Sequence, residues 1–544
     1  MPVVRIDLRR FERMVGAGRE QIVERLPYLG LDIEGSDPDS VRVEYSPNRP
    51  DFGTDFGIAR ALKGALGKET GLPRYPISKS GISLQVGPRL PAVRPYIACA
   101  VATGLSLGDE GIRQVISLQE DLHNGLGRRR RRVAIGLHDL DRVVPPLHYS
   151  GVPPSFSFRP LGGTGDSSVK EILSGTKEGK AYGSALHGSD LFPVITDSKG
   201  TVLSLPPVLN GEMTKVTPRT RNLFFDVTGT SQGGVDDVLA IMATTLAEAG
   251  GKLGSVSIVT SGRPRATPDL TPNSLPVDLG LINSTLGLDL TKGQVVEALG
   301  RSRLDVKRGR ALAGRYRVDL LHPVDLAEEV ALGYGTERIG PLYPPSESPG
   351  SLDRFEEFLD SVSNVMANSG MVELMTPELV DEASLYSKFG REPQGMLRVS
   401  DPKSLEHSVL RDSLLPNLAT ALSSNVKSDY PQRVFEVGRV YQRREGVVVE
   451  SWHLGCLIAH SSASFTEAKM YLDAAIRTVN GGEVSTNEVS DWAFVPGRTA
   501  SAYLGTERVG TAGELGPATL EAFGLGVPAA GFEVDLGVMY KLLK

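Results

Sequence analysis

Apolar positions follow two spacings along this chain, and each spacing predicts one kind of element. A continuous apolar run at 96–105 (YIACAVATGL) is typical of a buried strand. Between Ile112 and Leu122 apolar side chains recur at helical spacing, as one face of a helix requires. A wider stripe in the segment 351–369 favours a core helix, with a partner helix as the alternative. The strands and helices after it predict an antiparallel sheet with helices, not a doubly wound sheet.

Three segments rich in proline, serine and glycine interrupt this pattern, at 73–92, 260–276 and 343–351. Such composition is typical of linkers. The chain is therefore expected to be an α+β multidomain protein. The predicted parts are an N-terminal α/β module (1–84), a domain of strands and loops (90–262), a small α+β domain (270–346) and the domain with the antiparallel sheet (350–544).

Length and composition set the broad class. With 544 residues the chain is too long for one core, and 40% apolar with 23% charged residues is ordinary for a soluble protein. No stretch reaches the ~18 apolar residues of a membrane span, and the charged N-terminus does not resemble a secretory signal. Only Cys99 and Cys456 are present, which favours a reducing cytoplasm and excludes a cysteine-built zinc site. The net charge of −6 implies that any nucleic-acid contact is local.

Four carboxylates are concentrated between residues 315 and 335. Residues 316–321 predict a strand, His322-Pro323 a turn, and Asp325 the start of a helix. The carboxylates belong to Asp319, Asp325, Glu328 and Glu329. At about 100° per residue the three helical ones share one face, and the one at the strand end can point at the same spot. Without a local Lys or Arg they would repel one another unless a cation such as Mg²⁺ lies among them. The alternative is a D-x-x-E helix cap with a solvated face.

Polar side chains also end two predicted strands of the second domain. Ser204 and Asn210 follow one strand, and Asp226 and Thr228 lie on one face at the end of another. Polar groups at strand ends line pockets in many enzymes, although turn initiation alone would explain them. Upstream, five consecutive arginines in Gly125–Arg132 predict a solvated loop or, alternatively, a loop that contacts phosphate.

Taken together, these segments resemble the β subunit of phenylalanyl-tRNA synthetases of the shorter archaeal and eukaryotic type, over essentially the whole chain. No single motif is decisive, but eight occur in the family's order. They are SPNRPD with GIARAL (46–62), RPYIACAV (94–101), LQEDLHNGLGRRRRRVAIGLHDLD (118–141), SLPPVLNG with FFDVTGT (204–230), VDLLHPVDLAEEVALGYG (318–335), LRDSLLP (410–416), FEVGRVY (435–441) and FVPGRTA (494–500).

The resemblance implies roles for the polar clusters. It makes the small domain a B5 domain whose four carboxylates, Asp319, Asp325, Glu328 and Glu329, bind Mg²⁺. It makes residues 90–262 a B3/B4 editing domain, which would hydrolyse Tyr-tRNA(Phe). A pocket for phenylalanine cannot strongly reject tyrosine by binding alone, so such a second site is needed. The expected editing residues are Asp226 for the tyrosyl hydroxyl, Asn210, Thr228 and Ser204 lining the pocket, and His138 and Arg219 near the tRNA end.

In the last domain the resemblance is to the class II synthetase catalytic fold, but with phosphate-binding groups missing. Pro377 holds the proline position of the first motif. Where the second motif needs an arginine this chain has Gln442, and where the third needs a glycine and an arginine it has Asp535 and Val538. A neutral amide and a valine cannot replace two guanidiniums, and Asp535 would repel a triphosphate. This domain is therefore expected to be catalytically silent.

The resemblance also implies partners. Adenylation, with ATP and phenylalanine, is expected on a separate α subunit in an α₂β₂ heterotetramer that binds tRNA(Phe), docked partly through the apolar helix 351–369. Two other classes remain open. One is a nucleic-acid-binding scaffold without enzymatic activity, because B5 resembles helix-turn-helix folds and the arginine run is basic. The other is a stand-alone aminoacyl-tRNA deacylase.

Overall fold

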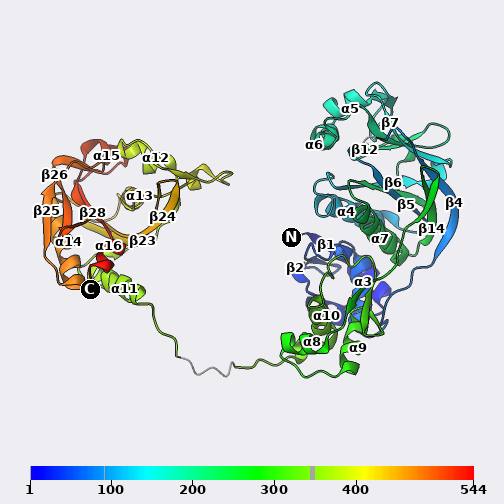
Figure 1. Ribbon diagram of the computed structural model, residues 1–544, viewed down its shortest axis with the longest axis horizontal. Helices are drawn as coiled ribbons and strands as arrows, with labels where there is room; N and C mark the ends of the chain where they lie inside the picture. The colour runs from blue at the N-terminus through cyan, green and yellow to red at the C-terminus, as the bar shows by residue number, and fades with distance from the viewer. Residues whose placement is uncertain (1, 91, 344–348, 544) are drawn as a thin grey trace. The chain divides into compact units, whose positions relative to one another are not determined.

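The computed structural model describes residues 2–90, 92–343 and 349–543, and the chain divides into two compact units. The first unit is Met1–Tyr343 and the second is Pro344–Lys544 (Figure 1). Within the described ranges, no helix has the length and apolar character needed to cross a membrane.

The first unit begins with a small α/β module. Its sheet has the order β1-β3-β2, formed by Val3–Asp7, Ser40–Glu44 and Asp32–Ser36. Strand β1 leads directly into α1 (Leu8–Val15), and the Asp7 side chain caps this helix by accepting from the Arg10 N–H. Helix α3 (Asp55–Ala65) is capped by the side chain of Thr54.

A ten-stranded sheet forms the centre of the first unit. Its strands are β4 (Ile77–Val86), β5 (Tyr96–Thr103), β6 (Val133–Asp139), β7 (Leu147–Val152), β10 (Phe192–Thr196), β11 (Val202–Leu205), β12 (Leu209–Asn210), β13 (Leu223–Gly229), β14 (Lys252–Thr260) and β15 (Arg263–Thr267). They follow the order β12-β11-β10-β7-β4-β14-β5-β13-β6, with β15 on β14. The two ends of this order approach each other, because the Asn210 amide on β12 donates to the Leu137 carbonyl on β6 at 3.3 Å.

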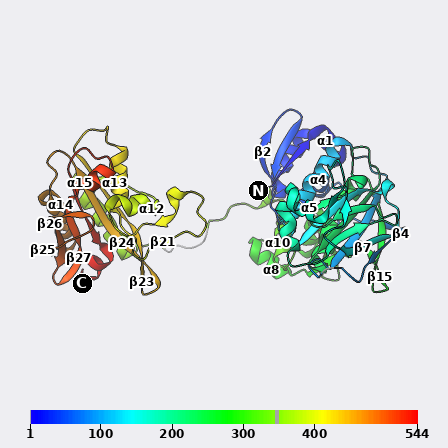
Figure 2. The same ribbon diagram turned by 90° about the horizontal axis from the view of Figure 1, so that it is seen from above.

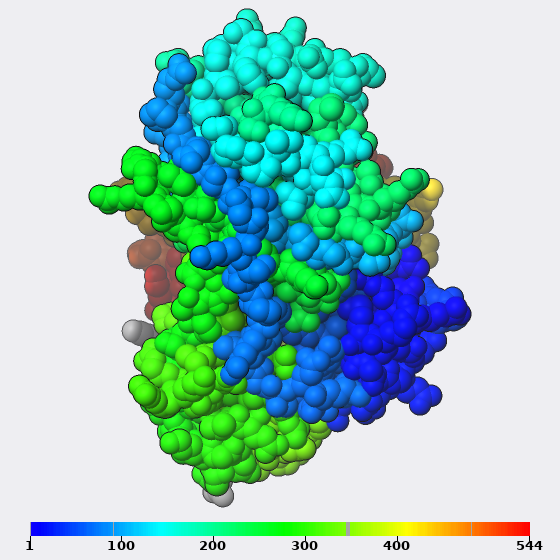
Figure 3. Space-filling model, turned by 90° about the vertical axis from the view of Figure 1, so that its right-hand side faces the viewer, coloured from blue at the N-terminus to red at the C-terminus, as the bar shows by residue number. Residues whose placement is uncertain are grey.

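Two segments predicted as linkers are in fact part of sheets. The segment 73–92 contains β4, which pairs in parallel with both β14 and β7. Figure 3 shows it as a blue band across the surface. The segment 260–276 supplies β15 to the large sheet and β16 (Asn273–Pro276) to the next domain. Glycine is tolerated in β4 because it lies at a register shift. Pro264 and Pro276 are tolerated because β15 and β16 are edge strands.

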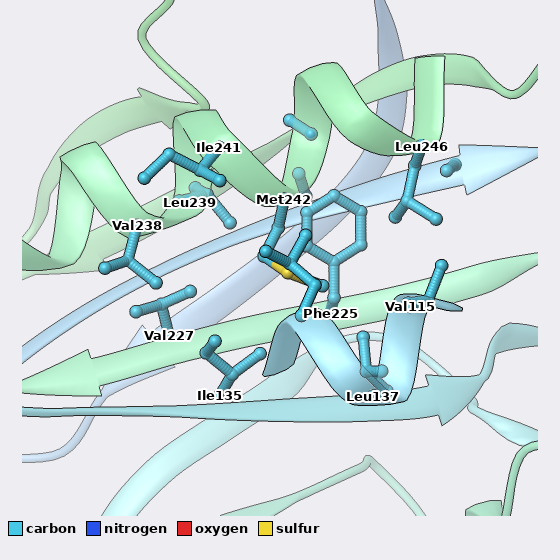
Figure 4. Close-up of a cluster of buried hydrophobic side chains, with 14 of the residues drawn as sticks. Val115, Ile135, Leu137, Phe225, Val227, Val238, Leu239, Ile241, Met242 and Leu246 are labelled. Carbon is cyan, nitrogen blue, oxygen red and sulfur yellow. The ribbon is translucent and has the colours of Figure 1, made fainter. Parts of the chain in front are cut away.

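Helices α4 (Gly108–Asn124) and α7 (Gln232–Glu248) bury their apolar faces with β13 and β6. Figure 4 shows Phe225 and Val227 of β13 close to Met242 and Leu239 of α7. Successive side chains of a strand face opposite sides, so this packing directs Asp226 and Thr228 to the other face of β13. The core thus fixes the orientation of the predicted site residues.

The B5-like part has the sheet order β16-β18-β17, with β17 at Asp305–Lys307 and β18 at Arg310–Ala313. Its helices are α8 (Leu279–Leu286), α9 (Lys292–Arg301) and α10 (Asp325–Tyr334), and Thr291 caps α9 as expected. The predicted strand at 316–321 is wrong. The Arg317 N–H closes a turn onto the Gly314 carbonyl, and the buried Arg317 side chain pairs with carboxylates on both sides of the next turn.

The second unit is built on the predicted antiparallel sheet (Figure 2). Its order is β19-β23-β24-β28-β27-β26-β25, and only the β19–β23 pair is parallel. The strands are Val372–Glu373, Gln432–Arg444, Val447–Ala459, Ala529–Asp535, Glu507–Leu515, Phe494–Leu504 and Val484–Glu488 in that order. Helices α11 (Arg354–Asn368) and α14 (Phe465–Asn480) pack against each other, and α16 (Leu536–Lys541) follows β28.

The apolar stripe of α11 lies in the core of the second unit. Phe358, Leu359, Val362 and Met366 are all buried there, and Phe355 packs against Tyr540 with 5.0 Å between the ring centres. The unit therefore covers this stripe with its own side chains, and docking of an α subunit partly through this helix stays a prediction.

Candidate editing pocket

A cavity of about 510 Å³ lies between β6, β13, the end of β11 and α4. Four of the predicted editing residues line it: Ser204, Asn210, Asp226 and Thr228. His138 lies behind Asp226. Arg219 is exposed and does not line the cavity. The structure thus brings the four predicted strand-end residues together, while His138 and Arg219 do not line the cavity.

Asp226 is the central carboxylate of this pocket, and it is 1% exposed. Its Oδ2 lies 3.1 Å from His138 Nε2, while His138 Nδ1 lies 2.8 Å from the Thr214 hydroxyl. A neutral imidazole satisfies both contacts when Nε2 donates to Asp226 and Nδ1 accepts from Thr214. The second oxygen, Oδ1, accepts no hydrogen bond from the described residues. Asp226 thus has a fixed orientation and an acceptor left over.

Gly136 makes this arrangement possible, although the sequence did not single it out. It is the partner of Asp226 across the β6–β13 ladder. A Cβ at Gly136 would lie 2.2 Å from Asp226 Oδ2 and 2.7 Å from His138 Nε2. Any side chain there would displace the carboxylate or the imidazole. The only sequence signal is a glycine inside a strand pattern, which marks a close approach.

Two hydroxyls complete the polar lining. Thr228 Oγ1 accepts from the buried Arg94 at 2.8 Å, so its own proton is free to be donated elsewhere. Burial lowers the pKa of Arg94 to about 10, which leaves the guanidinium charged at neutral pH. The Ser204 hydroxyl is buried and has no hydrogen-bond partner among the residues described. A buried hydroxyl without a partner is costly, which is expected where a ligand completes the site.

The cavity rim includes an ion pair that the sequence did not identify. Glu120 on α4 accepts from Arg130 at 2.8 Å, and Arg130 also donates to the Val208 carbonyl at 3.0 Å. His123 accepts the Ile135 N–H through Nε2, so its Nδ1 proton points at Glu120. That hydrogen bond, with the Arg130 charge, lowers the pKa of Glu120. Of the five arginines in the run, Arg130 is therefore part of the cavity rim, and the other four are exposed.

The four carboxylates of the B5-like part do not form a metal-binding set. No cluster of three or more His, Cys, Asp or Glu side chains able to hold a metal occurs in the described ranges. Asp319 and Glu329 both bind Arg317, so the premise that no arginine is near is wrong. Asp325 Oδ2 accepts the backbone N–H groups of Leu321 and His322, each at 2.7 Å. The side chain of Glu328 is exposed. As arranged, this donor set does not fit Mg²⁺.

In the second unit, the positions where the class II motifs differ have internal partners. Gln442 accepts two hydrogen bonds from Arg444. Asp535 caps α16 by accepting from the Val538 N–H at 2.9 Å. These contacts give both residues a structural role in the sheet and the helix after it. The two positions where class II motifs need an arginine, Gln442 and Val538, still lack a guanidinium.

Two family models match the chain. The tRNA synthetase B5 domain matches residues 275–336, and the CLM domain of the phenylalanyl-tRNA synthetase β chain matches residues 339–536. Together they define a subunit of an aminoacyl-tRNA synthetase, which is a ligase.

Relatives of known name agree over the full length. The chain is 40% identical to a phenylalanine–tRNA ligase β subunit of Archaeoglobus fulgidus, with 99% of each chain covered. It is 36% identical to one of Methanococcoides burtonii, over 98% of this chain and 100% of that relative. A crystal structure of an N-terminal fragment of the Pyrococcus horikoshii β subunit matches with a TM-score of 0.58 and 36% identity, over 61% of this chain and 99% of the fragment. The chain belongs to the family of phenylalanine–tRNA ligase β subunits.

Proposed function

We propose that the pocket around Asp226 hydrolyses tyrosine wrongly attached to tRNA(Phe), while an α subunit performs the adenylation. The observation that carries this proposal is a buried carboxylate with an oxygen left over, beside a buried serine hydroxyl that has no partner among the described residues. A cavity of this kind suits a ligand that brings its own donors and acceptors.

The chemistry favours tyrosine over phenylalanine at this place. The phenolic O–H of a tyrosyl group donates to Asp226 Oδ1, whereas phenylalanine leaves that buried acceptor unpaired. A site built to bind a hydroxyl rejects the analogue that lacks it by about 10⁴-fold or more. Pro206, Pro207 and Leu209 add apolar surface to the cavity lining, which suits an aromatic ring.

Hydrolysis needs an attacking water and a stabilised ester oxygen. No Ser–His or Cys–His nucleophile pair is formed by the described residues of this pocket, since His138 faces Asp226 and Thr214. A positioned water is therefore the nucleophile, assisted by a hydroxyl of the terminal ribose of the tRNA. The Ser204 and Thr228 hydroxyls are the donors placed to orient the ester or that water.

The remaining partners follow the family. ATP, phenylalanine and Mg²⁺ for adenylation enter through the α subunit of an α₂β₂ assembly that binds tRNA(Phe). With the α11 stripe buried, we place docking at the outer edge of β19, where Val372 is exposed and the nearby Met375 is 99% exposed. Both cysteines are free and buried, consistent with the cytoplasm as the expected location.

The test uses the reconstituted α/β complex and preformed Tyr-tRNA(Phe). Asp226→Ala is expected to slow deacylation about 100-fold, because the hydroxyl loses its acceptor. Phenylalanine-dependent pyrophosphate exchange should stay unchanged. Asp166→Ala, an exposed aspartate of the same domain, is the matched control. Unchanged deacylation in Asp226→Ala would contradict the assignment.

The same assay separates the alternatives. A deacylase that acts alone would give the same rate with and without the α subunit. A scaffold without enzymatic activity would bind tRNA and leave Tyr-tRNA(Phe) intact in every variant.

A further inference from the structure

Six buried or nearly buried charges meet where the B5-like part joins the N-terminal module. Three are arginines and three are carboxylates, and none of their side chains is more than 14% exposed. The six are Arg49, Arg60, Arg317, Asp51, Asp319 and Glu329. Formal charge therefore balances inside the group.

Arg317 is the centre of the B5 side of this group. Its Nε donates to Asp319 Oδ1 at 2.9 Å and its Nη2 to Oδ2 at 2.6 Å, a two-pronged contact. Its Nη1 donates to Glu329 Oε2 at 3.1 Å, and its Nη2 also contacts Glu329 Oε1. Burial alone would raise the pKa of Glu329, but the Arg317 charge more than offsets it and the net shift is downward. Glu329 is therefore held in its ionised form, and Asp319 shares the same guanidinium as its counter-charge.

The other half of the group comes from the SPNRPD motif and from α3, the helix that follows it. Asp51 accepts from Arg49 at 2.9 Å and from Arg60 at 3.0 Å. The Arg60 guanidinium lies 3.7 Å from the centre of the Tyr316 ring, next to Arg317 in the chain. The charge of Arg49 also lowers the pKa of Glu329. The motif and α3 thus lie against the B5-like part, through the stacking of Arg60 on Tyr316 and the effect of the Arg49 charge on Glu329.

A divalent cation would disturb this balance. Mg²⁺ requires near-octahedral oxygen ligands at roughly 2.0–2.1 Å and keeps several waters. Asp319 and Glu329 already direct oxygens at the guanidinium, Asp325 uses one on backbone amides, and Glu328 faces outward. Two extra positive charges would have to displace Arg317 into a buried site without a counter-ion, which is expensive.

We propose that Arg317 is the resident cation of the B5 carboxylates, and that the arginine–carboxylate group, not a metal ion, joins the B5-like part to the N-terminal module. The group replaces metal–ligand bonds by charge-assisted hydrogen bonds, in which each carboxylate has a guanidinium partner with a fixed planar geometry. This inference does not depend on the editing pocket.

The experiment measures bound metal and thermal unfolding of the full-length chain, free of nucleotide. After dialysis against EDTA and then buffer with Mg²⁺, the wild-type chain is expected to hold far less than one equivalent of magnesium and to keep its Tm. Arg317→Gln is expected to lower the Tm by about 5–10 °C, since it leaves two buried carboxylates unpaired. In this variant added Mg²⁺ should restore part of the Tm.

Arg301→Gln is the matched control, because Arg301 lies in the same part and forms an exposed ion pair with Glu297. It should change the Tm by less than about 2 °C and stay insensitive to Mg²⁺. If Arg317→Gln does not fold, Glu329→Gln is measured instead; it removes one carboxylate and is expected to be milder and still insensitive to Mg²⁺. One equivalent of magnesium in the wild-type chain, with a Tm that falls in EDTA, would overturn the proposal. So would an Arg317→Gln chain with unchanged Tm.

Discussion

The pocket of the first unit and the class II-like sheet of the second differ in how their polar groups are satisfied. In the pocket, the Ser204 hydroxyl has no partner among the described residues and Asp226 keeps an oxygen to spare. In the sheet, Gln442 is bound by Arg444, and Asp535 caps a helix. Leaving buried polar groups unpaired costs stability. The polar groups of the pocket are therefore open to a ligand, whereas those at the class II motif positions already have partners within the chain.

Glu533 is the clearest example of a polar group whose partners all lie within the chain. It lies on β28 beside Asp535 and receives Ser413 Oγ, the Leu414 N–H and His453 Nδ1. Burial raises its pKa, but these hydrogen bonds and the His453 charge lower it by more, so the net shift is downward. A carboxylate bound on three sides has no capacity left for a substrate. This buried charge of the second unit thus stabilises the fold.

The largest effect is expected from breaking a buried pair of the second unit. Arg411 of the LRDSLLP motif binds Glu436 at 2.7 Å, and both side chains are 2% exposed. Arg411→Met should lower the free energy of unfolding of that unit by about 3–5 kcal/mol, because Glu436 loses its counter-charge. Urea titration followed by circular dichroism measures it. Deacylation of Tyr-tRNA(Phe) at a temperature where the chain stays folded should be unaffected, and a parallel loss would contradict the distinction between the units.

Gly136→Ala should have the opposite effect to Arg411→Met: it should impair deacylation and leave stability nearly unchanged. Its Cβ would collide with Asp226 Oδ2, so deacylation is expected to fall about 10- to 100-fold while the Tm changes little. Gly165→Ala, where a Cβ would meet nothing within 4 Å, is the control. Hydrolysis rates of Tyr-tRNA(Phe) by the α/β complex give the readout. Wild-type rates in Gly136→Ala would mean that the Asp226–His138 contact has no part in catalysis.

The smallest effect concerns pH. Because the pKa of Glu533 is lowered in the folded chain, its contribution is fully present above the unfolded value near 4.5 and is lost as the pH falls through the folded value. The stability difference between wild type and Glu533→Gln should therefore be constant from about pH 6 to 8. It should shrink by less than about 1 kcal/mol between about pH 5 and 4. Unfolding titrations at each pH measure it, and a difference that grows on acidification would reverse the sign.

The sequence predicted secondary-structure elements and motifs better than it predicted which strands and side chains pair with each other. The strand at 96–103, the helices α4 and α9 and the antiparallel sheet were predictable, because apolar spacing reports burial directly. The polar strand ends of the pocket were also predictable, since Ser204 and Asp226 interrupt apolar runs.

Pairing over long separations could not be predicted from the sequence. The segment 73–92 looks like a linker but becomes β4, because its partner strands β14 and β7 lie far along the chain. The role of Arg317 was missed for a different reason. It lies among the carboxylates of the segment 315–335, but side-chain direction across a turn cannot be read from spacing, so the carboxylates were assigned to a metal. Gly136 and Glu120 were missed because their roles exist only against β13 and Arg130.

The proposed function divides the work between this chain, which proofreads, and a partner, which activates the amino acid. The most direct test is phenylalanine-dependent exchange of pyrophosphate into ATP by the purified chain alone. We expect no exchange above background, with full exchange once the α subunit is added, because neither Gln442 nor Val538 can bind phosphate as a guanidinium does. Exchange catalysed by the single chain would contradict this division.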